Sequence, residues 1–359
     1  MRLLMLTRYD RRGASSRVRA LQYVGCLQGA GFQVQVAPLL PDSYIDGLQQ
    51  GTRRMGDVLR GYAGRVRELL RGNRYDLIWI EKEALPWVPG PLERLLYREG
   101  VPYVLDYDDA VFHQYDQHRS ALWRGMLGGK HPALIRGASL VVAGNGYLAE
   151  FARNCGGTNV HVIPTVVDLR KYAAPGTRPG AGDRARIGWV GQRATAHFLQ
   201  PYCELFARLT SETGARFAAI GIDAASLGLP MESIAWSEAS EASSLQDLDV
   251  GIMPLTDGPF ERGKCGYKLV QYMASGIPVV ASPVGVNRDI VKHGVNGYLA
   301  DTEAEWELAL RKLVAEPELR LTMGAAGRRL VEEHFSLQAA APKFAALLRA
   351  AVPKRALRP

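Results

Sequence analysis

Short apolar runs alternate with longer amphipathic stretches along the first half of the chain. Several runs are apolar at consecutive positions, which is typical of strands buried on both faces of a sheet. Residues 15–31 begin with serines and end near glycine, which predicts a helix with a serine cap. We predict parallel strands joined by crossover helices, with the strands at residues 3–7, 33–39, 76–80, 102–107, 140–144 and 160–164.

The same alternation restarts after a Gly/Pro-rich stretch without periodicity. Strands are predicted at residues 186–191, 216–221, 233–238, 249–255, 277–282 and 297–300. The fold class is therefore α/β, with two Rossmann-like, doubly wound parallel-sheet domains facing a cleft, and ligands at the carboxyl ends of the strands. The predicted boundaries are an N-terminal domain at 1–172, a linker at 173–185, a C-terminal domain at 186–335, and a C-terminal helix at 336–359 that crosses back to the N-terminal domain.

Charge is distributed unevenly over these two halves. The formal net charge is +8, and residues 1–171 hold 23 Lys and Arg against 16 Asp and Glu, a net +7. An anionic partner is therefore expected on the N-terminal side, either a phosphorylated substrate or a lipid surface. Nucleic acid is not expected, because no aromatic-interleaved or zinc module accompanies the charge.

Cysteine usage and hydropathy indicate the compartment. The four cysteines are scattered without a CxxC pair, which predicts reduced thiols and no structural zinc. The apolar run at the N-terminus is too short for a signal peptide, and no stretch approaches the ~18 apolar residues of a spanning helix. We expect a cytoplasmic protein that can lie peripherally on the inner membrane.

The stretch "GKCGYKLVQYMASGIPVVASPVG" (263–285) combines glycines, lysines and a buried strand. A helix beginning near Cys265 would direct its amino end at an anion, and Lys264 and Lys268 would add positive charge. Gly263 and Gly266 would let the backbone approach a bulky ligand. Taken alone, the stretch fits a phosphate site and an ordinary glycine-started helix with solvated lysines equally well.

A longer match separates these alternatives. Residues 267–336, with the preceding 236–264, resemble the C-terminal half of the family 4 glycosyltransferases of GT-B fold, in a bacterial subgroup of that family. The resemblance implies a nucleotide diphosphate sugar bound mainly to the C-terminal domain, as a co-substrate rather than a cofactor. It also implies an acceptor-side N-terminal domain, and retaining sugar transfer without a metal.

The family's E-x7-E pattern is altered in this sequence. Its two positions are Gly263 and Gln271, so the first Glu, which meets the donor sugar, is missing. Gln271 can still hydrogen-bond ribose hydroxyls, and Glu261 is the candidate substitute for the missing acid. Lys264 and Lys268, with the backbone of Cys265 and Gly266, suit a diphosphate without Mg²⁺.

Two further loops correspond to phosphate-facing loops of the family. Gly13 matches the Gly-rich loop after the first strand, with Arg17 in the next helical turn. Arg193 follows the first strand of the C-terminal domain, where the family often has an Arg and a Lys. The alternatives are a capped surface helix at Gly13 and a solvated loop residue at Arg193.

The stretch "VLDYDDAVFHQYD" (104–116) ends a buried strand with three acids. Carboxylates at a strand end are costly unless they bind something. Asp108, Asp109 and the nearby His113 are therefore candidate catalytic residues that orient an acceptor hydroxyl or contact the donor sugar. The alternatives are a helix cap, pairing with arginines, or a metal site that includes Asp106, which the lysines at the phosphate make less favoured.

Residues 51–74 are rich in arginine and have helical periodicity. Arg60 and Arg67, together with Arg17, are the candidate contacts to the acceptor or to an anionic inner-membrane surface. An ordinary core-packing helix with solvated arginines fits the pattern equally well.

The first functional hypothesis is a transferase that builds a surface polysaccharide or glycoconjugate on a glycan or lipid-linked acceptor. The second is a soluble transferase acting on a small natural product. The third is a catalytically inactive GT-B protein that binds a sugar, an idea motivated by Gly263 at the position of the first Glu.

Overall fold

The computed structural model describes residues 1–49, 51–52, 54–97, 100–172 and 184–353. The chain forms two compact units: unit 1 contains Met1–Val166, Gly263–Cys265 and Leu337–Pro359, and unit 2 contains Val167–Arg262 and Gly266–Ser336. The predicted linker at 173–185 lies outside the described residues except for its last two positions, as do residues 354–359 of the predicted C-terminal helix.

Unit 1 contains a six-stranded parallel sheet of order β2-β1-β3-β4-β5-β6. The strands are β1 (Arg2–Tyr9), β2 (Gln33–Leu40), β3 (Leu77–Glu81), β4 (Tyr103–Tyr107), β5 (Leu140–Ala143) and β6 (Val160–Val162). Each overlaps a strand that the apolar runs predicted, so this part of the sequence analysis is confirmed.

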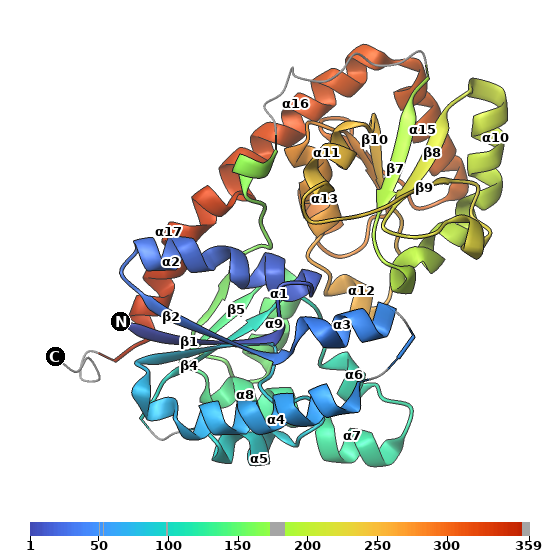
Figure 1. Cartoon of the computed structure of the whole chain (residues 1–359). Coiled ribbons are helices and arrows are strands. Elements are labelled where there is room, and N and C mark those ends of the chain that lie inside the picture. The colour runs from blue at the N-terminus through green and yellow to red at the C-terminus, as the bar shows by residue number, and fades with distance from the viewer. Residues whose placement is uncertain (50, 53, 98–99, 173–183, 354–359) are drawn as a thin grey trace. The chain divides into compact units, whose positions relative to one another are not determined.

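Helices cover both faces of this sheet (Figure 1). They are α1 (Ala14–Arg19), η1 (Leu21–Tyr23), α2 (Val24–Gly29), α3 (Asp42–Gln49), α4 (Met55–Leu70), η2 (Gly72–Arg74), α5 (Gly90–Leu95), α6 (His113–Asp116), α7 (Ala121–Leu127), α8 (Lys130–Gly137), α9 (Gly146–Asn154) and α17 (Leu337–Ala350). Helix α17 is part of the core: the ring of Phe344 lies 5.0 Å from that of Tyr23 and 4.6 Å from that of Trp79, edge to face.

The single capped helix predicted at residues 15–31 is wrong in two respects. The segment is divided into α1, η1 and α2, and α1 begins after Gly13 without a side-chain cap. The serines are used elsewhere, because Ser15 and Ser16 hydrogen-bond carboxylates at the ends of neighbouring strands.

Unit 2 contains a second six-stranded parallel sheet, of order β12-β11-β10-β7-β8-β9. Its elements are β7 (Arg186–Val190), β8 (Arg216–Ile220), β9 (Glu232–Ile234), β10 (Val250–Met253), β11 (Val279–Ala281), β12 (Gly297–Leu299), η3 (Leu169–Lys171), η4 (Arg193–Tyr202), α10 (Cys203–Thr213), η5 (Ala225–Leu227), α11 (Glu241–Gln246), α12 (Pro259–Arg262), α13 (Tyr267–Ala274), α14 (Asn287–Ile290), α15 (Glu303–Ala315) and α16 (Pro317–His334).

Two apolar clusters pack against opposite faces of the second sheet. One includes Phe206 of α10 and Trp306 of α15, and the other includes Leu269 of α13 and Val331 of α16. Numbered from β7, the strand order reads 3-2-1-4-5-6, the dinucleotide-binding order. The prediction of two doubly wound, Rossmann-like units is therefore confirmed.

Candidate functional site

Unit 1 carries a cluster of charged side chains where its strand order reverses. Strands β1 and β3 are neighbours, yet the chain proceeds outward from them in opposite directions, which makes their carboxyl ends the topological switch point. Ser15 follows β1, while Glu81 and Lys82 stand at the end of β3. Asp108 follows the next strand, β4, so the sheet brings distant sequence segments to one edge.

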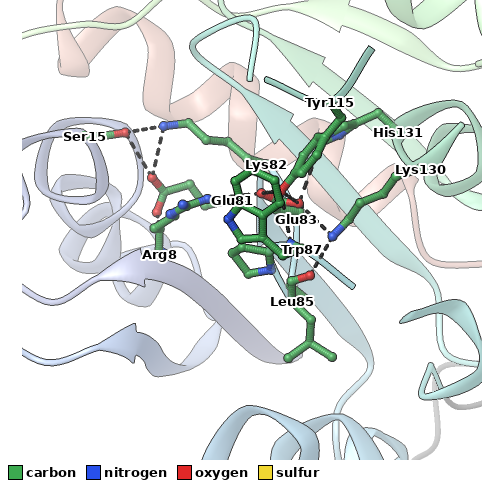
Figure 2. Close-up of polar contacts among 12 residues, drawn as sticks. Arg8, Ser15, Glu81, Lys82, Glu83, Leu85, Trp87, Tyr115, Lys130 and His131 are labelled. Carbon is green, nitrogen blue, oxygen red and sulfur yellow. Dashed lines mark hydrogen bonds and ion pairs between the residues drawn. The ribbon is translucent and has the colours of Figure 1, made fainter. Parts of the chain in front are cut away.

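Asp108 is the centre of this cluster. Its carboxylate lies 2.9 Å from Lys82 Nζ and accepts a 2.9 Å hydrogen bond from Ser15 Oγ. Lys82 Nζ also donates to Ser15 Oγ at 2.7 Å and lies 3.7 Å from Glu81 Oε1 (Figure 2). Glu81 in turn accepts from the Ser16 hydroxyl at 2.6 Å. These side chains therefore hold one another in a single arrangement.

The charges in this cluster stabilise one another despite burial. Burial alone would raise the pKa of Asp108, but Lys82 and Arg19 lower it below its ordinary value. Burial would likewise lower the pKa of Lys82, yet Asp108 and Glu81 raise it. At neutral pH the two side chains form an ion pair.

Asp106 is held separately by Arg19. The guanidinium contacts one carboxylate oxygen of Asp106 through Nε at 2.9 Å and Nη2 at 2.7 Å, and Trp79 Nε1 donates to the other at 3.2 Å. Burial raises the pKa of Asp106 to about 6, and Arg19 opposes that rise. Asp106 therefore has a structural partner.

A second buried group follows directly in the chain. Glu83 lies 2.7 Å from Lys130 Nζ and 3.1 Å from Arg8 Nη1, and it accepts from the Tyr115 hydroxyl at 2.9 Å (Figure 2). Burial would raise the pKa of Glu83, but the charge of Lys130 lowers it. Burial also lowers the pKa of His131 to about 4, so this imidazole is neutral at physiological pH.

The remaining predicted residues of unit 1 lie around this edge in different environments. His113 is engaged at both ring nitrogens, by Asp116 at 2.9 Å and by the Tyr147 hydroxyl at 2.8 Å. Asp109 is half-buried and contributes to the raised pKa of Lys82. Arg17 is buried, with Nη1 donating to the Arg11 carbonyl at 3.3 Å.

Gly13 matters for packing. It precedes α1, and a Cβ added there would lie 2.1 Å from Cβ of Tyr9. The position therefore accepts only glycine without displacement of the β1 end.

The segment Gly263–Cys265 belongs to unit 1. Asn145 Nδ2 donates to the carbonyls of Gly263 and Lys264, both at 3.0 Å, while its Oδ1 accepts from Leu148 N. Asn145 therefore caps α9 and also holds this segment. The Cys265 thiol, whose pKa is raised by burial, donates to the Asp108 carbonyl at 2.9 Å.

Helix α13 of unit 2 begins at Tyr267, two residues later than the predicted start near Cys265. Gly266 precedes it with φ of 64°, a left-handed conformation that favours glycine and interrupts the helix before this point. Gly263 is also tightly placed, because a Cβ there would lie 2.4 Å from that of Ala110. Both glycines thus have a structural requirement.

Lys268, in the first turn of α13, lies over an aromatic ring at the end of a central strand. Its Nζ is 4.1 Å from the ring centroid of Trp189, on β7. Because β7 and β10 flank the switch point of the second sheet, Lys268 stands where nucleotide ligands of such sheets bind. A cation and a helix amino end occur together there.

The other predicted donor residues differ in accessibility. Gln271 is buried in α13, Glu261 is half-buried on α12, and Lys264 is half-buried. Arg193 is exposed at the start of η4, directly after β7.

The predicted helix in the basic stretch is present as α4. Arg67 is exposed, and Arg60 is exposed with a 3.0 Å ion pair to Asp57. Leu69 and Arg65 of the same helix are buried, and Arg65 donates to backbone carbonyls of unit 1. Within the described part of the chain, no helix is long and apolar enough to cross a membrane.

Sequence reasoning missed Glu81, Lys82, Glu83 and Arg19. The signal for the first three was available, since "EKE" follows the apolar run "DLIWI" as the acids at 106–109 follow theirs. Arg19 gave no such signal, because its partner Asp106 lies 87 residues away.

Residues 189–316 match the family model described as "Glycosyl transferases group 1". This segment is similar to the group 1 glycosyltransferases, and the two Rossmann-like units have the GT-B fold. Among curated proteins, 63 residues of this chain are 38% identical to human alpha-1,3/1,6-mannosyltransferase ALG2. That match spans 17% of this chain and 15% of the human protein.

Solved glycosyltransferase structures share the fold over nearly the whole chain. Sucrose-phosphate synthase from Thermosynechococcus elongatus is 16% identical, with a TM-score of 0.74 over 98% of each chain. Anabaena HepE, in complex with UDP-glucose, is 18% identical, with a TM-score of 0.66 over 98% of this chain and 100% of HepE. WaaG, a glycosyltransferase involved in lipopolysaccharide biosynthesis, is 14% identical, with a TM-score of 0.68 over 97% and 99%.

Proposed function

We propose that the chain transfers a sugar from a nucleotide diphosphate sugar to a hydroxyl of a glycan or lipid-linked acceptor, with retention of configuration and without a bound metal. One observation carries the proposal: the segment that matches the family, 189–316, contains Gly266, α13 and Lys268 at the switch point of the second sheet. Helix amides and lysine ammonium groups are the protein's means of binding a diphosphate.

The lysines have a role in the chemistry as well as in binding. When the sugar leaves, negative charge develops on the diphosphate, and fixed cations stabilise that charge more than the ground state. Lys268, whose Nζ lies over the Trp189 ring, and Lys264 are proposed to supply this positive charge. The leaving phosphate can itself take the proton of the acceptor hydroxyl on the same face of the sugar, so no protein nucleophile is required.

Unit 1 would contribute orientation. The Asp108 carboxylate, held by Lys82 and Ser15, has lone pairs suited to accept a hydrogen bond from a sugar hydroxyl. Fixing one hydroxyl in a productive geometry supplies part of the rate enhancement by proximity. Asp109 and His113 are proposed to line the same region.

The proposed donor base is uracil, since HepE was solved with UDP and with UDP-glucose. The proposed setting is the cytoplasmic face of the inner membrane, where a surface polysaccharide or glycoconjugate would be assembled. WaaG, named for lipopolysaccharide biosynthesis, supports that choice of pathway class.

Nucleotide binding and turnover test this function. UDP, GDP, ADP, dTDP and CMP are titrated in a thermal-shift assay, and we expect UDP to stabilise the chain by about 2.7 kcal/mol at a hundredfold excess over Kd. UDP-sugars are then supplied with EDTA present, and UDP release is followed. Stabilisation by UDP without turnover of any donor would favour the inactive sugar-binding alternative. Activity that is lost in EDTA and restored by Mn²⁺ would overturn metal independence.

A further inference from the structure

The loop after β3 presents a tryptophan at the surface of unit 1 in a strained conformation. Trp87 has φ of 61°, and among the described residues only Lys82 shares a positive φ without being glycine. A bulky residue with positive φ persists only where its surroundings hold it. Even so, the Trp87 side chain remains 45% exposed. The fold therefore holds an indole at the surface at a conformational cost.

Buried side chains fix this loop at nearly every backbone group. Lys130 Nζ donates to the Leu85 carbonyl at 2.5 Å, and the Tyr115 hydroxyl accepts from Trp87 N at 3.2 Å (Figure 2). Further bonds join Arg65 to the Ala84 carbonyl, Tyr62 to the Pro86 carbonyl, and the Glu93 carboxylate to the amides of Ala84 and Leu85. Trp87 is thus rigidly placed.

A second exposed aromatic residue, Trp123 of α7, packs against Trp87. The Trp87 ring lies 5.9 Å from that of Trp123 and 6.0 Å from that of His118, both edge to face. On α7, Leu122 is 70% exposed and Met126 49% exposed, while Leu127 anchors the helix in the unit. Met126 is the i+4 neighbour of Leu122 and the i+3 neighbour of Trp123, so these exposed apolar side chains lie together on the helix surface. Trp87, Leu122, Trp123 and Met126 form what we call the tryptophan surface.

Positive charge accompanies the tryptophan surface. Residues 117–129 contain Arg119 and Arg124, both exposed, and no Asp or Glu. Trp236, an exposed tryptophan of unit 2, offers a contrast, because its indole donates to the Glu241 carboxylate at 3.0 Å. Cations beside tryptophan and aliphatic side chains complement anionic lipid headgroups above an acyl layer.

We propose that the tryptophan surface docks unit 1 onto an anionic lipid bilayer, with Trp87 and Trp123 at headgroup depth. A glycan platform would need carboxylates or amides at its edge to meet sugar hydroxyls, and the sequence 117–129 supplies only Gln117. The apolar side chains that enter the bilayer would then lie on α7 and the loop at Trp87. They would not lie on the basic helix α4, the region predicted from sequence. This docking does not depend on the transfer reaction.

Vesicle sedimentation of the full chain tests the surface. Vesicles of phosphatidylcholine with phosphatidylglycerol are compared with phosphatidylcholine alone. We expect the wild type to sediment with the anionic vesicles, and Leu122→Ser/Trp123→Ser to lower the partition coefficient at least about tenfold. Trp236→Ser, an equally exposed tryptophan in unit 2, is the matched control and should sediment like the wild type.

Four outcomes would overturn the proposal. Wild-type failure to bind anionic vesicles, or unchanged sedimentation of Leu122→Ser/Trp123→Ser, would overturn it. So would loss of binding in Arg60→Gln/Arg67→Gln with the tryptophan variant unaffected, because that would return the anchor to α4. A wild-type dimer in light scattering that the tryptophan variant abolishes would assign the surface to a second copy instead. UDP affinity, measured on the same samples, should stay constant and keeps this test separate from that of the transfer function.

Discussion

Units 1 and 2 differ in the kinds of charged side chain that they bury. In the described part of the chain, every buried Asp, Glu and Lys lies in unit 1, where carboxylates such as Asp108 meet cations such as Lys82. The buried charged side chains of unit 2 are Arg320 and Arg328, which donate to backbone carbonyls and contact the more exposed carboxylates of Asp249 and Glu332. Lys268, at the switch point of unit 2, lies half-buried over Trp189.

This difference indicates two ways of preparing a site. Unit 1 neutralises its charges internally, so its cluster is rigid before any ligand arrives. Unit 2 places a cation beside a helix amino end, an arrangement that attracts anions. We therefore propose that unit 1 supplies rigid positioning and that unit 2 supplies electrostatic attraction of a diphosphate.

The largest effect should come from breaking the internal neutralisation of unit 1. Lys82→Met would leave Asp108 and Glu81 buried without their ammonium partner. Removing one partner of a buried ion pair costs about 3–5 kcal/mol. We expect the free energy of unfolding to fall by that amount in urea titrations followed by tryptophan fluorescence.

Two controls make this result specific. Lys292→Met removes an exposed lysine of unit 2 and should change stability by no more than about 0.5 kcal/mol. The double variant Lys82→Met/Asp108→Asn should lose less free energy of unfolding than the two single variants lose in sum, because neither partner of the ion pair is then left buried without the other. Additive losses would mean that Lys82 and Asp108 do not interact, and the contrast between the units would lose its basis.

The strands were predictable from sequence, whereas this pairing was not. A run such as "DLIWI" identifies a buried strand by itself, since burial on both faces removes the polar alternation. The bond from Ser15 to Asp108 joins residues 93 positions apart and depends on the strand order, which local patterns do not contain. Likewise, the start of α13 depends on the left-handed conformation of Gly266. A glycine permits this conformation, but its presence in the sequence does not predict it.

An intermediate effect on UDP binding is expected from the two lysines of residues 263–285, Lys268 in unit 2 and Lys264 in unit 1. Lys268→Ala and Lys264→Ala should each weaken UDP binding by about 1.5–3 kcal/mol, the range for a hydrogen bond to a charged group. Isothermal calorimetry on both variants measures this.

The chain offers a matched control for Lys268. Lys312 also lies over an aromatic ring, with Nζ 5.9 Å from the Tyr298 centroid, but it belongs to α15 rather than to the switch point. Lys312→Ala should leave UDP affinity unchanged. If both Lys264→Ala and Lys268→Ala also bound UDP like the wild type, the phosphate interpretation of residues 263–285 would fail.

The smallest effect is expected on turnover when the charge of Asp108 in unit 1 is removed. This variant distinguishes a role in orienting the substrate from a role in binding it. Asp108→Asn keeps the shape of the side chain and its bond to Ser15 while removing the charge. If the carboxylate orients a hydroxyl, turnover should drop at least about tenfold, equivalent to 1.4 kcal/mol of transition-state stabilisation. UDP affinity should be unaffected, because its proposed site is in unit 2. Asp109→Asn, at a half-buried position, tests the neighbouring carboxylate in the same way.

A structural role alone would give a different pattern of results. Asp108→Asn should melt earlier in either case, since Lys82 would lose its closest carboxylate, but with a structural role alone it would turn over normally at low temperature. Asp76→Asn is the control, because Asp76 pairs with Arg2 at the start of β1, outside the Lys82 cluster. Melting temperature, UDP affinity and kcat are measured on all three variants. Normal kcat in both Asp108→Asn and Asp109→Asn would remove these acids from the site and leave unit 1 with a rigid edge that serves folding only.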